Sequence, residues 1–277
     1  MSPRLARVAS AIVLAPLAIA ALLWLPTPWL ALAIACLMMA GLWEWTALAG
    51  VESPLSRAVF LVANALLMAA LAWGSRGSPD LVPLKLVAVA GAAWWLLVPL
   101  WFAKFGFASR PGAFARAFKL LAGSMSVIPA WCALVWLHHD APLGPRWTLF
   151  AVAIVWAADT GAYFVGSRFG KRKLAPRISP GKSWEGLAGG LAASALAAVA
   201  AVPLLQLQWP QLPALVALVL ATVAISVVGD LFESLLKRHA GMKDSADLIP
   251  GHGGILDRID SLLAALPVFV VLRGLLL

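Results

Sequence analysis

The sequence GDLFESLLKRHAGMKDSADLIPGHGGILDRID, residues 229–260, is a long polar stretch in an otherwise apolar chain. It holds six of the chain's 12 acidic residues, namely Asp230, Glu233, Asp244, Asp247, Asp257 and Asp260. It also holds four basic residues and two histidines: Lys237, Arg238, Lys243, Arg258, His239 and His252. Carboxylates bind hard divalent cations and basic side chains bind phosphate oxygens. The mixture therefore predicts a metal-assisted site for a polyanionic ligand.

The remainder of the chain is too apolar for a soluble domain. Of its 277 residues, 62% are hydrophobic and only 12% are charged, whereas soluble domains carry about 25% charged residues. Windows of about 20 apolar residues predict nine membrane spans, at residues 8–25, 29–49, 57–74, 84–103, 119–138, 147–167, 184–205, 212–231 and 260–277. We therefore expect an all-α polytopic integral membrane protein with an uncleaved first span.

Basic residues are divided unequally between the two sides of these spans. With the N-terminus inside, 17 of the 21 lysines and arginines fall on inner segments. Cytoplasmic loops carry an excess of such residues, so we expect a cytoplasmic N-terminus and a C-terminus on the outer side. The net charge of +9 is then a signal of orientation. No basic soluble domain is available for nucleic acid, so we expect no nucleic-acid partner.

The polar segments divide the chain into two predicted regions. Residues 1–118 contain spans one to four and a segment, 104–119, in which phenylalanines alternate with basic residues. This segment predicts either an interfacial helix on anionic headgroups or a plain connector. Residues 119–277 contain spans five to nine and the predicted cytoplasmic loops 168–183 and 232–259. We expect this second region to be the catalytic half.

Glu44 and Asp159 fall inside predicted spans, where charge is costly and usually functional. Glu44 lies near the inner end of the second span, where we favour an interfacial carboxylate paired with a nearby arginine. Asp159 lies in the segment AADTGAYFVG of the sixth span. We expect Asp159 to line a polar cavity or a substrate path.

The segment RFGKRKLAPRISPGKSWE, residues 168–185, carries six basic residues before Ser183. Gly181-Lys182-Ser183 invites a P-loop interpretation, but that motif needs a glycine where this chain has Pro176. The segment instead predicts a cationic loop for phosphate oxygens that leads directly into the seventh span. Gly186 and Gly190 predict close packing of that span on a neighbour.

Helical spacing organises the 229–260 stretch itself. Asp230, Glu233 and Lys237 share one helix face, while Gly251 to Gly254 predict a loop that lets backbone approach a ligand. Asp257 and Asp260 begin the last span, where a helix N-terminus also offers N–H groups to phosphate. Asp230 and Asp257 come from different helices and together predict a Mg²⁺ site.

These residues resemble the signature of the phosphatidate cytidylyltransferases, also called CDP-diacylglycerol synthases. The matching residues are Ser234-Leu235-Leu236-Lys237-Arg238, Lys243-Asp244 and His252-Gly253-Gly254-Ile255-Leu256-Asp257-Arg258-Ile259-Asp260. The segments AADTGAYFVG and SPGKSWEG are also similar to family motifs, so the resemblance covers at least residues 157–260. Gly181 stands where the family often has a second basic residue, and Ser183 where threonine is common.

The resemblance implies transfer of a cytidylyl group from CTP to phosphatidic acid at the cytoplasmic membrane face, with Mg²⁺ as cofactor. The products would be CDP-diacylglycerol, for phospholipid synthesis, and pyrophosphate. Asp230 and Asp257 would hold Mg²⁺, and a second cation is left open. The expected catalytic residues are Asp230, Lys237, Arg238, Asp257 and Arg258. The expected substrate-binding residues are Asp159, Ser179, Lys182, Lys243, Asp244, His252, Gly253, Gly254 and Asp260.

The expected location is the bacterial inner membrane, with the lipid bilayer, CTP and phosphatidic acid as partners. A homodimer is implied by the resemblance alone. One alternative is another CTP-using membrane lipid kinase or transferase. A second is a secondary transporter, which would place its charges near the bilayer midplane in two related halves. A non-catalytic membrane scaffold would not need the charged array at 230–260.

Overall fold

The computed structural model describes the backbone of residues 3–78, 80–246 and 253–277, with side chains from Leu14 onward. Over these residues the chain forms nine α-helices, one β-hairpin and one short 3-10 helix, Trp209–Gln211. The helices are α1 (Pro3–Trp24), α2 (Thr27–Leu48), α3 (Pro54–Ser75), α4 (Val82–Ala103), α5 (Ala113–His139), α6 (Gly144–Phe169), α7 (Trp184–Ala201), α8 (Leu212–His239) and α9 (Leu256–Leu276). The hairpin pairs β1 (Lys173–Ala175) with β2 (Ser179–Ser183).

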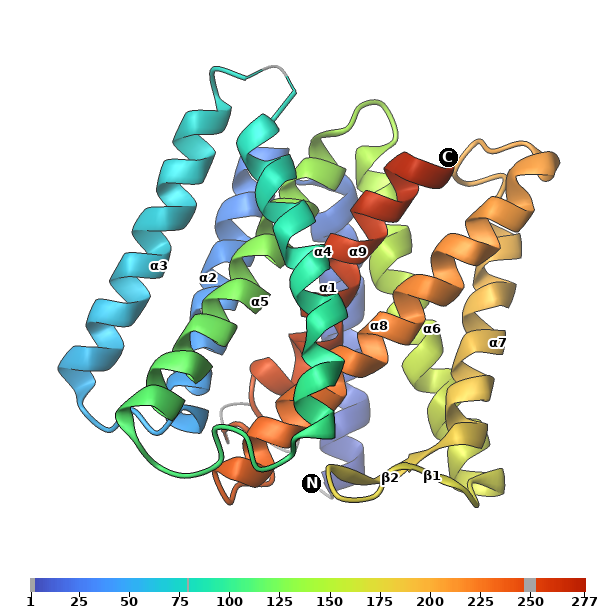
Figure 1. Ribbon diagram of the computed structural model, residues 1–277. Coiled ribbons are helices and arrows are strands. Elements are labelled where there is room, and N and C mark those ends of the chain that lie inside the picture. The colour runs from blue at the N-terminus through green and yellow to red at the C-terminus, as the bar shows by residue number, and fades with distance from the viewer. Residues whose placement is uncertain (1–2, 79, 247–252) are drawn as a thin grey trace.

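Successive helices run in alternate directions through the bundle, so α1 begins and α9 ends at opposite ends (Figure 1). The eight helices α2 to α9 are long and apolar enough to cross a membrane, and the described apolar part of α1 is shorter, Leu14–Trp24. The prediction of an all-α polytopic membrane protein is confirmed. The number of crossings and their orientation remain predictions.

Proline marks the start of many of these helices. Five of them (α2, α3, α4, α6 and α8) have a proline at their first or second position. Proline lacks the N–H that would be unpaired there and its φ is already helical. Ser183 caps α7 in a different way, because its hydroxyl accepts the Gly186 N–H at 3.1 Å. The turn predicted to lead into the seventh span is thus a helix cap.

Two connecting segments refine the sequence prediction. The cationic segment after α6 is an antiparallel hairpin rather than an irregular loop, and the Glu185 carboxylate accepts the N–H groups of Lys171 and Arg172 at 3.2 Å. Residues 104–112 form turns, and α5 begins at Ala113. For residues 104–112 the structure therefore agrees with a connector and not with an interfacial helix.

Close helix contacts at small residues bring the polar segments together. A Cβ at Gly190 would lie 2.8 Å from the carbonyl oxygen of Ala158, so α7 packs directly on α6. A Cβ at Gly229 would lie 2.6 Å from the carbonyl oxygen of Asp260, so α8 and α9 touch in the same way. Small residues permit such approaches between membrane helices. The predicted packing role of Gly186 and Gly190 is confirmed.

An aromatic cluster fixes α8 from its other side. Phe232 has no exposed surface, and its ring centroid lies 5.9, 6.2, 5.8 and 5.1 Å from those of Trp45, Trp94, Trp95 and Trp101. These tryptophans belong to α2 and α4. The N-terminal helices therefore hold the stretch of α8 that carries Asp230 and Glu233.

Replacing Phe232 with alanine should lower the free energy of unfolding by about 3 to 5 kcal/mol, because it leaves a cavity inside the aromatic cluster. Denaturant unfolding of the purified protein in detergent measures this difference. The matched control is Phe164→Ala on α6, whose side chain is 65% exposed; we expect it to change stability by about 0.5 kcal/mol or less. Equal losses for the two variants would contradict a supporting role for the cluster.

Candidate functional site

A cavity of about 580 Å³ opens where α6, α7, α8, α9 and β2 meet. Its charged lining residues are Asp159, Lys182, Asp230, Asp257, Arg258 and Asp260. All six are predicted from the sequence as site residues, and they come from four different elements, α6, β2, α8 and α9. Gly166, Gly186 and Gly190 form part of the wall between α6 and α7. The cavity thus combines four carboxylates with two cations.

One ion pair on the cavity wall joins the hairpin to α8. Lys182 Nζ lies 2.5 Å from Asp230 Oδ2, and the two side chains are 24% and 30% exposed. Asp230 Oδ1 also accepts the hydroxyl of Ser234 at 3.4 Å. Partly exposed ion pairs are worth about 0 to 1 kcal/mol. An incoming anion can therefore compete for Lys182 and an incoming cation for Asp230.

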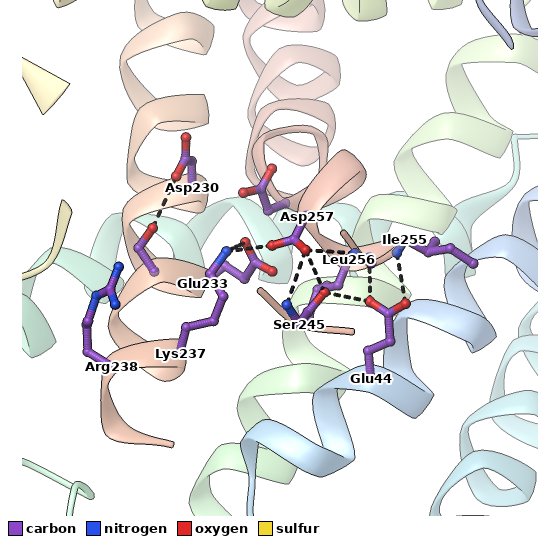
Figure 2. Close-up of polar contacts among 12 residues, drawn as sticks. Glu44, Asp230, Glu233, Lys237, Arg238, Ser245, Ile255, Leu256 and Asp257 are labelled. Atoms are coloured by element: carbon purple, nitrogen blue, oxygen red, sulfur yellow. Dashed lines mark hydrogen bonds and ion pairs between the residues drawn. The ribbon is translucent and has the colours of Figure 1, made fainter. Parts of the chain in front are cut away.

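A second set of ion pairs lies deeper, where α8 packs on α9. Lys237 Nζ lies 2.8 Å from Glu233 Oε2 and 2.6 Å from Asp257 Oδ1, with its side chain 11% exposed (Figure 2). Lys237 therefore faces these two carboxylates, while Asp230, predicted on the same helix face, faces Lys182. This lysine holds two helices together and does not line the cavity.

The Asp257 carboxylate is held by donors on both of its oxygens. Oδ1 accepts Lys237 Nζ, and Oδ2 accepts the Gly254 N–H at 2.8 Å, the Ser245 N–H at 3.1 Å and the Ser245 hydroxyl at 3.0 Å. A carboxylate offers about four acceptor positions, so these contacts fix its orientation. The loops on either side of residues 247–252 thereby set the direction of Asp257.

Glu233 and Asp260 form a carboxyl pair beside this network. The side chain of Glu233 interacts with that of Asp260. Oε1 of Glu233 is buried, and no N–H or hydroxyl group of the described residues donates a hydrogen bond to it. Asp260 Oδ1 accepts the N–H of Ser261 at 2.6 Å. Two carboxyl groups in contact are stabilised by a proton or a cation placed near them. This end of the cavity is therefore suited to positive charge.

Glu44 on α2 is a site residue that the sequence interpretation placed wrongly. We expected an interfacial carboxylate paired with an arginine. Glu44 is instead 2% exposed and accepts the hydroxyl of Ser245 at 2.7 Å and the N–H groups of Ile255 and Leu256 at 2.8 Å (Figure 2). A charge inside a span was the signal that could have identified it.

The other predicted site residues that the structure describes lie outside the cavity wall. Arg238 Nε donates to the carbonyl of Ile178 at 3.2 Å, while Lys243 and Asp244 are exposed. Gly253 has a φ of 75°. Gly254 donates its N–H to Asp257 and so helps to hold that carboxylate. Ser179 begins β2. His252 lies outside the described residues.

Residues 5–276 match the cytidylyltransferase family. The chain belongs to this family. It is 44% identical to the phosphatidate cytidylyltransferase of Pseudomonas aeruginosa over 267 residues, 96% of this chain and 95% of that protein. It is 39% identical to that of Haemophilus influenzae over 278 residues, 95% of this chain and 96% of the relative. A match to the Bacillus subtilis protein, 45% identical, covers 48% of this chain and 49% of the relative. The family match over residues 5–276 includes the N-terminal helices.

Removing the lysine should change the free energy of unfolding by different amounts in the two ion-pair sets. Lys237→Met should lower the free energy of unfolding by about 3 to 5 kcal/mol, because it leaves buried carboxylates without a counter-charge. Lys182→Met should cost about 1 kcal/mol or less, because its pair with Asp230 is partly exposed. Denaturant unfolding in detergent compares the two variants. A larger loss for Lys182→Met would refute the assignment of Lys237 as the structural lysine.

Proposed function

We propose that this chain transfers a cytidylyl group from CTP to phosphatidic acid, producing CDP-diacylglycerol and pyrophosphate for phospholipid synthesis. The observation that carries the proposal is the cavity in which Lys182 and Arg258 lie among four aspartates, at one end of a membrane bundle. It is supported by the end-to-end similarity to phosphatidate cytidylyltransferases. Both substrates are polyanions, and one of them is a membrane lipid.

The reaction needs no nucleophile from the protein. A phosphate oxygen of phosphatidic acid attacks the α-phosphorus of CTP, a new P–O bond forms, and the bond to the β-phosphate breaks to release pyrophosphate. The protein's task is to align the two phosphates and to offset their charge. Lys182 and Arg258 are the cationic residues on the cavity wall, so they are suited to bind phosphate oxygens and the leaving pyrophosphate.

The carboxylates of the cavity fit a Mg²⁺ ion in part. When bound, such an ion neutralises phosphate charge and orients the reacting oxygens. Asp230 is suited to bind Mg²⁺, because its carboxylate already pairs with the ammonium group of Lys182 and would only have to exchange that partner for the ion. Asp257 would have to give up one of its four donors, so it is the more constrained of the two proposed ligands.

Among the described residues, no group of three or more histidine, cysteine, aspartate or glutamate side chains forms a ready metal cage. Mg²⁺ usually binds through one or two carboxylates and completes its coordination with water and substrate phosphates. Asp260, on the same wall, is available to support the ion electrostatically. We therefore retain Asp230 and Asp257 as the proposed ligands.

The membrane setting gives the remaining parts of the proposal. Asp159 and Tyr163 lie on α6 at the cavity wall and are exposed, so a lipid headgroup can approach along this helix. The excess of basic residues in the segments at this end favours the cytoplasmic face of a bacterial inner membrane. We also propose that the protein forms a homodimer, which the family resemblance implies.

The activity is tested with purified protein in detergent, phosphatidic acid, CTP and Mg²⁺, by following CDP-diacylglycerol and pyrophosphate. Asp257→Asn should lower the rate by at least about 10²–10³-fold, as loss of an electrostatic contact at the reacting centre does, and EDTA should abolish product. The control Asp80→Asn, in the connector between α3 and α4, should retain wild-type activity.

Folded wild-type protein that makes no CDP-diacylglycerol would refute the proposal. Diacylglycerol and other lipid acceptors are included in the same assay. Phosphorylation or cytidylylation of one of these, in place of phosphatidic acid, would identify the related CTP-using kinase or transferase instead.

A further inference from the structure

Glu44 reaches the site from the far end of the sequence. Its carboxylate accepts hydrogen bonds from residues that are 201 to 212 positions away in the chain. These partners lie on both sides of residues 247–252, with Ser245 before them and Ile255 and Leu256 after them. One side chain of α2 therefore ties together the two loop ends that frame Asp257.

The start of α9 has no cap of its own. Its N-cap position is Ile255, which makes no side-chain cap hydrogen bond, although a helix start leaves N–H groups that need acceptors. Glu44 supplies both of its oxygens to the N–H groups of Ile255 and Leu256. A carboxylate at a helix N-terminus is stabilised by these groups and by the helix dipole. Glu44 thus fixes the position of the turn that carries Asp257.

Ser245 connects Glu44 to Asp257 directly. Its hydroxyl oxygen lies 2.7 Å from Glu44 Oε2 and 3.0 Å from Asp257 Oδ2. Its backbone N–H also donates to Asp257 Oδ2 at 3.1 Å. Both Ser245 and Glu44 are buried, at 2% exposure each. The path from α2 to the Asp257 carboxylate therefore passes through one serine.

Gly254 shows how closely this network is packed. A Cβ at this position would collide with the hydroxyl oxygen of Ser245 and with the carboxylate of Glu44. The Gly254 N–H meanwhile donates to Asp257 at 2.8 Å. The backbone at Gly254 therefore passes between the two carboxylates without room for another atom, in close contact with Glu44 and Ser245.

We propose that Glu44 is a positioning residue for the cytidylyl transfer: it holds the Asp257 carboxylate in its cavity-facing orientation through Ser245 and through the first N–H groups of α9. The inference rests on the proposed function. It assigns to the N-terminal half of the chain a specific part in the chemistry, in addition to its part in packing.

The test compares Glu44→Gln with the matched control Glu52→Gln, an exposed glutamate just beyond α2. Glutamine keeps the size of the side chain, but it has an NH₂ group in place of one carboxylate oxygen and so can accept hydrogen bonds at only one of the two positions. For Glu44→Gln we expect kcat/KM for CTP to fall by about 10- to 100-fold, as loss of an outer partner of a ligand residue typically causes. The Mg²⁺ concentration for half-maximal rate should rise, while KM for phosphatidic acid stays within about 2-fold. Glu44→Asp should recover part of the loss, and Glu52→Gln should match the wild type.

A second measurement uses the protein without substrates or metal. The unfolding free energies of Glu44→Gln, Ser245→Ala and the double variant should be less than additive, because the two residues share one network. Additive losses would overturn the inference. So would wild-type kinetics for Glu44→Gln, or a rate loss that only follows the amount of folded protein with unchanged CTP and Mg²⁺ dependence. An inactive wild-type protein would refute the proposed function instead, and the unfolding comparison would still test the network.

Discussion

The ammonium group of Lys237, shared between Glu233 and Asp257, is the contact on which the site depends. It is buried in an apolar bundle, where an unpaired charge is costly. It also joins α8 to α9 at the point where both carry carboxylates. The opposite side of α8 is held by the tryptophan cluster around Phe232. These two attachments fix where α8 lies, and the Lys237 pair also holds Asp257 on α9.

The charged residues at this end of the bundle fall into two groups with different tasks. Glu44, Glu233 and Lys237 are buried, and their contacts hold helices and loops in place. Lys182, Asp230 and Asp159 lie on the cavity wall with enough exposure to exchange their partners for a ligand. A reaction between two polyanions needs both groups. The cavity residues interact with the charged ligands, and the buried residues keep those cavity residues in fixed positions.

The sequence predicts much of this arrangement because the bilayer imposes it. Apolar runs of span length become helices, and the cavity residues Asp159, Lys182, Asp230 and Asp257 stand out as charges beside or inside these runs. Helical spacing places Glu233 one turn from Lys237, but it cannot show that Lys237 also reaches Asp257 on α9. The partners of Glu44 depend on contacts across more than 200 residues. The hairpin at 173–183 is too short to leave a strand pattern in its sequence.

We expect CTP to bind in the cavity between α6, α7, α8, α9 and β2. The decisive experiment is a structure of the protein with CTP and Mg²⁺ bound. Triphosphate density should lie in this cavity, with Lys182 released from Asp230 and in contact with a phosphate oxygen. Triphosphate density outside the cavity, for example in the surface hollow lined by Glu52, Ser56 and Arg116, with the Lys182–Asp230 pair intact, would contradict it.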